Sequence, residues 1–190
     1  ADRVIYCQNG YAAPDVMPQH VHEGILEQTK QFRQSFDRCA IFCGNGYAWH
    51  GLEDVISLIE TMPSIGLIVV GPYHEIPSQQ CLFLPHVNTS TLVSIFDYCD
   101  FGISTFRWDL LYITQGSPLK SRQFLCHGLP ILVNYYDCAT DIDALKPYVF
   151  NIQTNQDAFQ QIISTPHSRD TLKQLSQHYL SWDRYVDKIF

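Results

Sequence analysis

The chain has 190 residues, of which 46% are hydrophobic, 13% aromatic and 16% charged. This composition is that of a folded globular protein, and the length fits one α/β domain better than two. The formal net charge of −7, with only 12 scattered Lys and Arg residues, argues against a nucleic-acid-binding surface, because neutralising phosphates requires clustered basic residues.

Short runs of β-branched and aromatic residues alternate with amphipathic segments along the chain. The runs predict strands, because they are bounded by Gly, Pro or Asn. Most are apolar continuously rather than alternately, which is typical of parallel strands covered on both faces. The predicted strands are 3–7, 38–43, 66–71, 81–85, 101–104, 129–135 and 148–152.

Helices are predicted where apolar residues recur at intervals of three or four, as at Val55, Leu58, Ile59 and Met62. The predicted helices are 23–36, 51–62, 90–99, 119–128, 155–164 and 168–190. Because strands and helices alternate, the predicted fold class is α/β, with a Rossmann-like doubly wound parallel sheet.

The remaining global features concern membranes and cysteines. No apolar run approaches the roughly 18 residues that a transmembrane helix needs, and no signal segment opens the chain. The seven cysteines form an odd set without C-x-x-C spacing. We therefore expect a cytoplasmic protein whose thiols are reduced and mostly buried.

In a doubly wound sheet, ligands bind beyond the carboxyl ends of the strands, where loops and helix amino termini meet. One such loop, GNGYAWHG from Gly44 to Gly51, is a glycine turn that matches neither G-x-G-x-x-G nor a Walker motif. Another leads into the predicted helix that holds Lys120 in its first turn. A cation is unfavourable there unless an anion is bound, so Lys120 indicates a phosphate contact. The alternative is an ordinary surface lysine.

The order of these segments resembles the carboxyl-terminal, donor-binding domain of GT-B glycosyltransferases of family 4. The tract SPLKSRQFLCHGLPILV, 117–133, is similar to that family's S-P-x-K-x-x-E-[YF]-L-A-x-G-x-P-V-V. The tract RVIYCQNGYAAPDV, 3–16, resembles the crossover between the two domains of that fold, and SWDR, 181–184, resembles its closing motif. The resemblance implies that residues 1–190 form a single nucleotide-sugar-binding domain, one half of a GT-B fold. Residues 1–22 would then be the crossover segment, and the amino-terminal acceptor domain would be absent.

By the same resemblance, Lys120 and the backbone of Gly116 and Ser117 would contact the diphosphate of the donor. Gln123 and Gln115 stand where the family carries two glutamates, of which the one at Gln123 binds the ribose hydroxyls. An amide oxygen still accepts a hydrogen bond, but it lacks the charge-assisted strength of a carboxylate.

Within the glycine turn that begins at Gly44, the resemblance aligns Asn45 and His50 with the Arg and Lys that neutralise the diphosphate. With an ordinary pKa of about 6.5, His50 would be only partly charged at neutral pH. Tyr73 and the backbone of His86 and Val87 align with the nucleobase site. Three residues of a later loop could approach the donor sugar or phosphate: Arg107, Trp108 and Asp109.

The implied function is that of a retaining glycosyltransferase, which moves a hexosyl unit from a UDP- or GDP-sugar to a hydroxyl acceptor in glycan or polysaccharide assembly. This chain would bind the donor and be inactive alone, because acceptor-side catalytic residues would lie in the amino-terminal partner domain. No metal or other cofactor is expected, and the H-x-H pair of His20 and His22 lacks further ligands. Contact with the inner face of the membrane would involve only the absent half.

Two other functions remain open. The replacement of both acids and both basic residues favours a non-catalytic GT-B-like binding or regulatory module with a degenerate donor site. A GT-B nucleotide-sugar epimerase is a third possibility, which the SPLK tract and the SWDR motif make less favourable.

Overall fold

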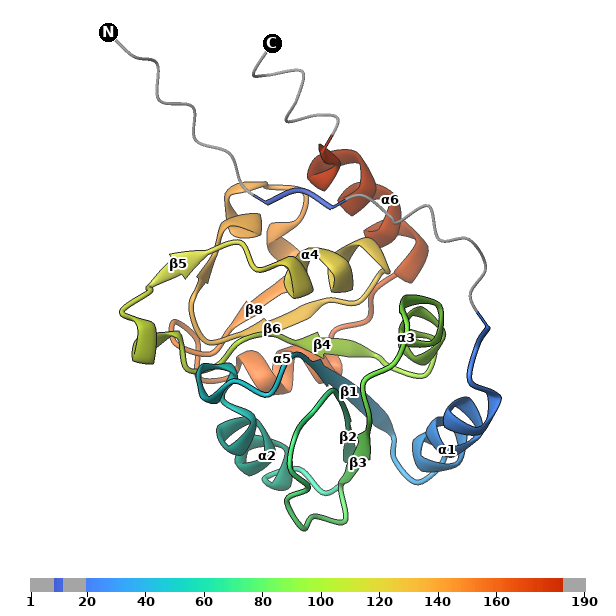
Figure 1. Ribbon diagram of the computed structural model, residues 1–190. Helices are drawn as coiled ribbons and strands as arrows, with labels where there is room; N and C mark the ends of the chain where they lie inside the picture. The colour runs from blue at the N-terminus through green and yellow to red at the C-terminus, as the bar shows by residue number, and fades with distance from the viewer. Residues whose placement is uncertain (1–8, 12–19, 183–190) are drawn as a thin grey trace, which may run out of the picture.

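The computed structural model describes residues 9–11 and 20–182 of the chain. Six strands form one parallel sheet in the order β3-β2-β1-β4-β6-β8 (Figure 1). From one edge to the other they are β3 (Cys81–Leu84), β2 (Ile65–Val70), β1 (Arg38–Cys43), β4 (Phe101–Ile103), β6 (Ile131–Val133) and β8 (Val149–Asn151). This is the strand order of a doubly wound fold, in which the connections reverse direction beside the first strand.

Helices cover both faces of the sheet. One face packs against α1 (Glu23–Arg33), α3 (Thr89–Phe96), α4 (Leu119–Cys126) and α6 (Arg169–Leu180). The other packs against α2 (Leu52–Glu60) and α5 (Ala158–Ser164). All six residues of β2 are buried, as expected for a strand that lies between two helical layers.

Short elements complete the loops. Four 3₁₀ turns are η1 (Ala48–His50), η2 (Trp108–Leu111), η3 (Cys138–Asp141) and η4 (Lys146–Tyr148). A separate two-stranded parallel sheet joins β5 (Gln115–Gly116) to β7 (Tyr136–Asp137). Two-residue strands carry no periodicity, so the sequence did not predict this small sheet.

The structure confirms the predicted α/β fold with a Rossmann-like parallel sheet. Each predicted strand and helix from residue 23 to residue 180 forms, most with ends displaced by a few residues. The predicted helix 168–190 is observed over Arg169–Leu180, and its last eight residues lie outside the described part of the chain. The predicted strand 3–7 also lies outside it.

The short segment 9–11 lies against α4 and α6. The Tyr11 amide donates to the Leu180 carbonyl at 2.7 Å, and the Asn9 side-chain amide donates to the Ser117 carbonyl at 2.6 Å. The assignment of residues 1–22 to a crossover segment stays a prediction. Within the described residues, no helix is long and apolar enough to span a membrane.

Candidate functional site

A cavity of about 250 Å³ lies at the carboxyl edge of the sheet, beside α4; we call it the α4 cavity. The ends of β1 and β2, the loop after β3 and the first half of α4 contribute to its wall. Seven of the predicted donor-binding residues line it, although they come from separate parts of the sequence: Gly44, Asn45, His50, His86, Val87, Lys120 and Gln123.

Lys120 lines this cavity with a buried cationic group, which is unusual for a lysine. It is the second residue of α4, and its Nζ is buried without a hydrogen-bond partner among the described residues. The Nζ lies 5.0 Å from the centroid of the Phe42 ring, a distance at which a cation is attracted weakly to an aromatic face. Burial lowers the pKa of Lys120 to about 8. The group therefore stays mostly charged at neutral pH, in a place where a bound anion would stabilise it.

His50 departs from the expectation that it carries partial positive charge. Its side chain is buried, and burial together with the nearby Lys120 charge lowers its pKa to about 4. The imidazole is therefore neutral at neutral pH and can contribute hydrogen bonds but no charge. Lys120 is thus the cationic side chain that lines the α4 cavity.

Tyr73 does not line the α4 cavity with the other predicted residues. Its hydroxyl hydrogen-bonds Nδ1 of His50 at 2.9 Å, and its ring packs against Phe42 with centroids 5.6 Å apart. Burial raises the pKa of Tyr73. The hydroxyl is thus already engaged with His50, and the ring belongs to the wall of a neighbouring cavity.

Gln115, Gly116 and Ser117 also lie outside the lining of the α4 cavity. Gln115 is exposed in the small β5–β7 sheet. Gly116 lies so close to Trp108 that an added Cβ would be 2.4 Å from its ring. The structure therefore gives Gly116 a packing role, whatever its backbone contributes to a ligand.

Ser117 lies at the half-buried end of a polar network that the sequence did not reveal. Its hydroxyl accepts hydrogen bonds from the backbone amide of Asn9 and from Nε of Arg122, both at 3.0 Å. The Arg122 guanidinium donates to Asp137 at 2.6 Å, and both side chains are fully buried. Asp137 also accepts from the Tyr135 hydroxyl at 2.8 Å. This network attaches the segment at Asn9 and the small sheet to the start of α4.

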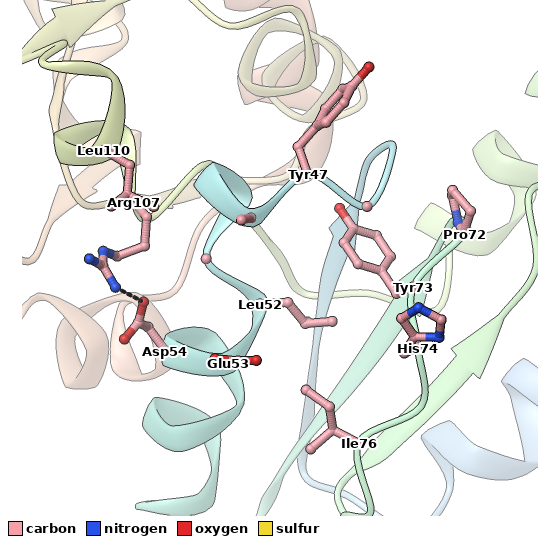
Figure 2. A pocket seen from close by; sticks show the side chains of 13 residues that line it. Tyr47, Leu52, Glu53, Asp54, Pro72, Tyr73, His74, Ile76, Arg107 and Leu110 are labelled. Carbon is pink, nitrogen blue, oxygen red and sulfur yellow. Dashed lines mark hydrogen bonds and ion pairs between the residues drawn. The ribbon is translucent and has the colours of Figure 1, made fainter.

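Arg107 and Asp109 face solvent, whereas Trp108 is buried against Tyr135 with ring centroids 4.3 Å apart. The Arg107 guanidinium pairs with Asp109 at 3.1 Å and with Asp54 at 3.4 Å. Figure 2 shows the Arg107–Asp54 pair at one side of a second cavity, which lies beside α2. Arg107 therefore lines this second cavity and does not line the α4 cavity.

In the described part of the chain, no three His, Cys, Asp or Glu residues are grouped in a way that could hold a metal ion. The polar chemistry of the α4 cavity is accordingly that of an ammonium group, side-chain amides, imidazoles and backbone groups. Such a set can bind an anionic ligand with hydroxyl groups through charge and hydrogen bonds.

No protein-family model and no curated protein sequence matches this chain. Among solved structures, the fold is similar to that of AviGT4, a glycosyltransferase involved in avilamycin A biosynthesis, with a TM-score of 0.59 and 13% sequence identity over 80% of this chain. The chain spans about 50% of the length of that protein. At such low identity the likeness shows the fold alone, a Rossmann-like α/β domain that matches one half of a GT-B fold.

Proposed function

We propose that this chain is the nucleotide-sugar-binding domain of a glycosyltransferase. The observation that carries the proposal is the buried, unpartnered Nζ of Lys120 in a cavity at the carboxyl edge of a doubly wound sheet. Ligands of this fold class bind at that edge, and the amino terminus of α4 adds backbone N–H groups that favour an anion. The fold shared with a glycosyltransferase supports the same function.

In this proposal Lys120 binds the diphosphate of the donor. As the bond between sugar and diphosphate breaks, negative charge grows on the leaving oxygen, and the buried ammonium group of Lys120 stabilises that charge. Asn45 and neutral His50 add hydrogen bonds to the diphosphate, and Gln123 binds the ribose. His86 and Val87 hold the nucleobase through their backbone.

The finer features of the proposal are a UDP- or GDP-hexose as donor, a hydroxyl group as acceptor, retention of anomeric configuration and no requirement for a metal. A separate amino-terminal domain would supply the acceptor-side residues. The 190-residue chain alone would then bind donor without transferring sugar. Measured turnover by this chain would contradict that division of labour.

Titration calorimetry with UDP, GDP, UDP-glucose and GDP-mannose tests the donor site. We expect micromolar binding of at least one nucleotide, weakened roughly 10- to 100-fold by Lys120→Ala because a charge-assisted contact is lost. Lys30→Ala, which removes an exposed lysine from α1, is the matched control and should bind like the unaltered chain. If none of the four compounds binds, the donor-site proposal is wrong.

A second candidate is a non-catalytic module with the same fold. The neutral state of His50 favours it, because Lys120 is then left as the cationic side chain in the α4 cavity. Binding of neither nucleotides nor nucleotide-sugars would support this candidate. Binding that Lys120→Ala weakens would exclude a degenerate donor site.

A further inference from the structure

The second cavity has a volume of about 440 Å³ and lies on the α2 side of the sheet; we call it the α2 cavity. It is formed by η1, the first turn of α2, the loop after β2 and the start of η2 (Figure 2). It is larger than the α4 cavity, and its volume falls within the range of roughly 300–1,000 Å³ that is typical of small-molecule sites. No residue that has a role under the proposed function lines this cavity.

A wall formed by the loops after β1 and β2 lies between the two cavities, whose linings share no residue. The loops after β1 and β2 touch through their backbones: a Cβ added at Gly71 would lie 2.1 Å from the Gly44 carbonyl oxygen, and one added at Gly46 would lie 2.7 Å from that of Pro72. The 2.9 Å hydrogen bond between His50 and Tyr73 lies in the same wall. The α2 cavity therefore has a lining of its own.

The α2 cavity combines an apolar side with a polar side. Figure 2 shows Leu52, Tyr73 and Ile76 in the space between α2 and the loop after β2. Glu53 and the Arg107–Asp54 pair lie on the side of α2 and η2. Flat apolar surfaces suit the C–H face of a sugar ring, and carboxylate and guanidinium groups suit its hydroxyls.

The charges of the lining argue against an anionic ligand. Arg107 is compensated by Asp54 and Asp109. Within the described residues, the exposed Glu53 carboxylate has no hydrogen-bond or ion-pair partner. A phosphate would meet uncompensated negative charge at this position, whereas hydroxyl groups could donate hydrogen bonds to it.

We propose that the α2 cavity binds an uncharged sugar ring, supplied either as the hexosyl group of the donor or as a saccharide acceptor. The proposal rests on the proposed function in so far as it names these two sources. The binding chemistry is the same for both sources: ring C–H groups against Leu52 and Tyr73, and hydroxyls toward Glu53 and Arg107.

Amide chemical-shift mapping by NMR on the 190-residue chain tests the proposal. The probes are methyl α-D-glucopyranoside, methyl α-D-mannopyranoside and methyl β-D-galactopyranoside, and separately UDP, UDP-glucose, GDP and GDP-mannose. We expect a sugar to shift amides of 46–49, 51–54 and 73–76. A nucleotide alone should shift amides of 43–45, 86–87 and 120–123.

Two substitutions test whether residues that line the α2 cavity bind the sugar. Glu53 and Tyr47 both line the α2 cavity. Glu53→Gln and Tyr47→Ala should each weaken sugar binding at least roughly fivefold, since each removes a contact worth about 1 kcal/mol or more, and should leave UDP binding unchanged. Glu60→Gln, at the other end of α2, and Tyr112→Ala, at an exposed tyrosine outside the cavity, are the matched controls. Both controls should bind sugar like the unaltered chain.

The two sources of sugar give different results. If the donor supplies the ring, UDP-glucose or GDP-mannose shifts α2-cavity amides that the nucleotide alone leaves unchanged. If the acceptor supplies it, a free glycoside shifts them in the presence of saturating nucleotide. The proposal is overturned if no sugar or nucleotide-sugar shifts these amides, or if the variants bind as the controls do. Nucleotide binding without sugar binding would defeat this inference alone, and sugar binding without nucleotide binding would defeat the donor-site proposal alone.

Discussion

Lys120 and Arg122 lie two positions apart on α4 and are both buried cations, but their surroundings are opposite. Arg122 is bound by Asp137 and Ser117, and its charge is compensated within the chain. The Nζ of Lys120 has no such partner among the described residues. A buried charge is costly unless it is paired, so the first arrangement is typical of a charge that holds the fold, and the second of a charge that awaits a ligand.

The largest predicted effect comes from removing the counter-ion of Arg122. Asp137→Asn leaves the Arg122 guanidinium buried without its counter-ion, so the free energy of unfolding should fall by about 3–5 kcal/mol. Guanidinium chloride denaturation measures the change. Asp143→Asn, at an exposed aspartate, should change it by less than about 0.5 kcal/mol. If the two variants were equally stable, the Arg122–Asp137 pair would not be a structural one.

Removing the unpaired charge of Lys120 should instead raise the free energy of unfolding. Burial holds the pKa of Lys120 below its ordinary value, at about 8, so the charged form destabilises the fold below pH 8, and this penalty fades as the pH rises toward the unfolded value. Lys120→Met should therefore raise the free energy of unfolding at pH 7 by about 1–3 kcal/mol while it weakens nucleotide binding roughly 10- to 100-fold.

Denaturation and calorimetry on the same Lys120→Met sample measure both effects, and Lys30→Met provides the exposed-lysine control. A variant that loses stability and binding together would mean that Lys120 supports the fold and is not held for a ligand.

The pH dependence of nucleotide binding tests whether Lys120 is the charged group that contacts the ligand. Because only the protonated Lys120 attracts a diphosphate, the affinity for UDP or GDP should fall as the pH rises through about 8. The expected loss is roughly tenfold between pH 7 and pH 9, whereas an ordinary lysine with a pKa of about 10.4 would cause almost none. Calorimetry across this range provides the measurement, and a constant affinity would contradict the assignment.

The smallest predicted effect concerns Ser117, a further hydrogen-bond partner of Arg122. Ser117→Ala removes the hydroxyl that accepts from Asn9 and Arg122, and the free energy of unfolding should fall by about 0.5–2 kcal/mol. Ser57→Ala, at an exposed serine of α2, is the matched control. A loss no larger than that of the control would show that the Ser117 contacts add nothing to stability.

Much of the fold could be predicted from local patterns. The continuously apolar runs at 38–43 and 66–71 indicated parallel strands buried on both faces, and β1 and β2 are such strands. The spacing of Val55 and Ile59 predicted α2, where both are buried. These signals depend on which residues repeat along a few turns or strand positions, so the sequence carries them directly.

The candidate site was predictable in part, because the loops at the carboxyl ends of parallel strands converge at one edge of the sheet. This rule brought His50, His86, Lys120 and Gln123 to one cavity. It did not reveal that Tyr73 lies in the wall and lines the α2 cavity. The direction of a loop side chain depends on tertiary contacts that no local pattern describes.

By itself, the sequence determined the order of strands and helices, their burial and the loops in which a ligand site would form. Only the tertiary structure decided that His50 is neutral, that the Nζ of Lys120 is buried and unpartnered, and that Arg122 meets Asp137 from 15 positions away. The physical reason is that pKa values and ion pairing depend on the exclusion of water and on contacts between distant residues. Both arise only when the chain is folded.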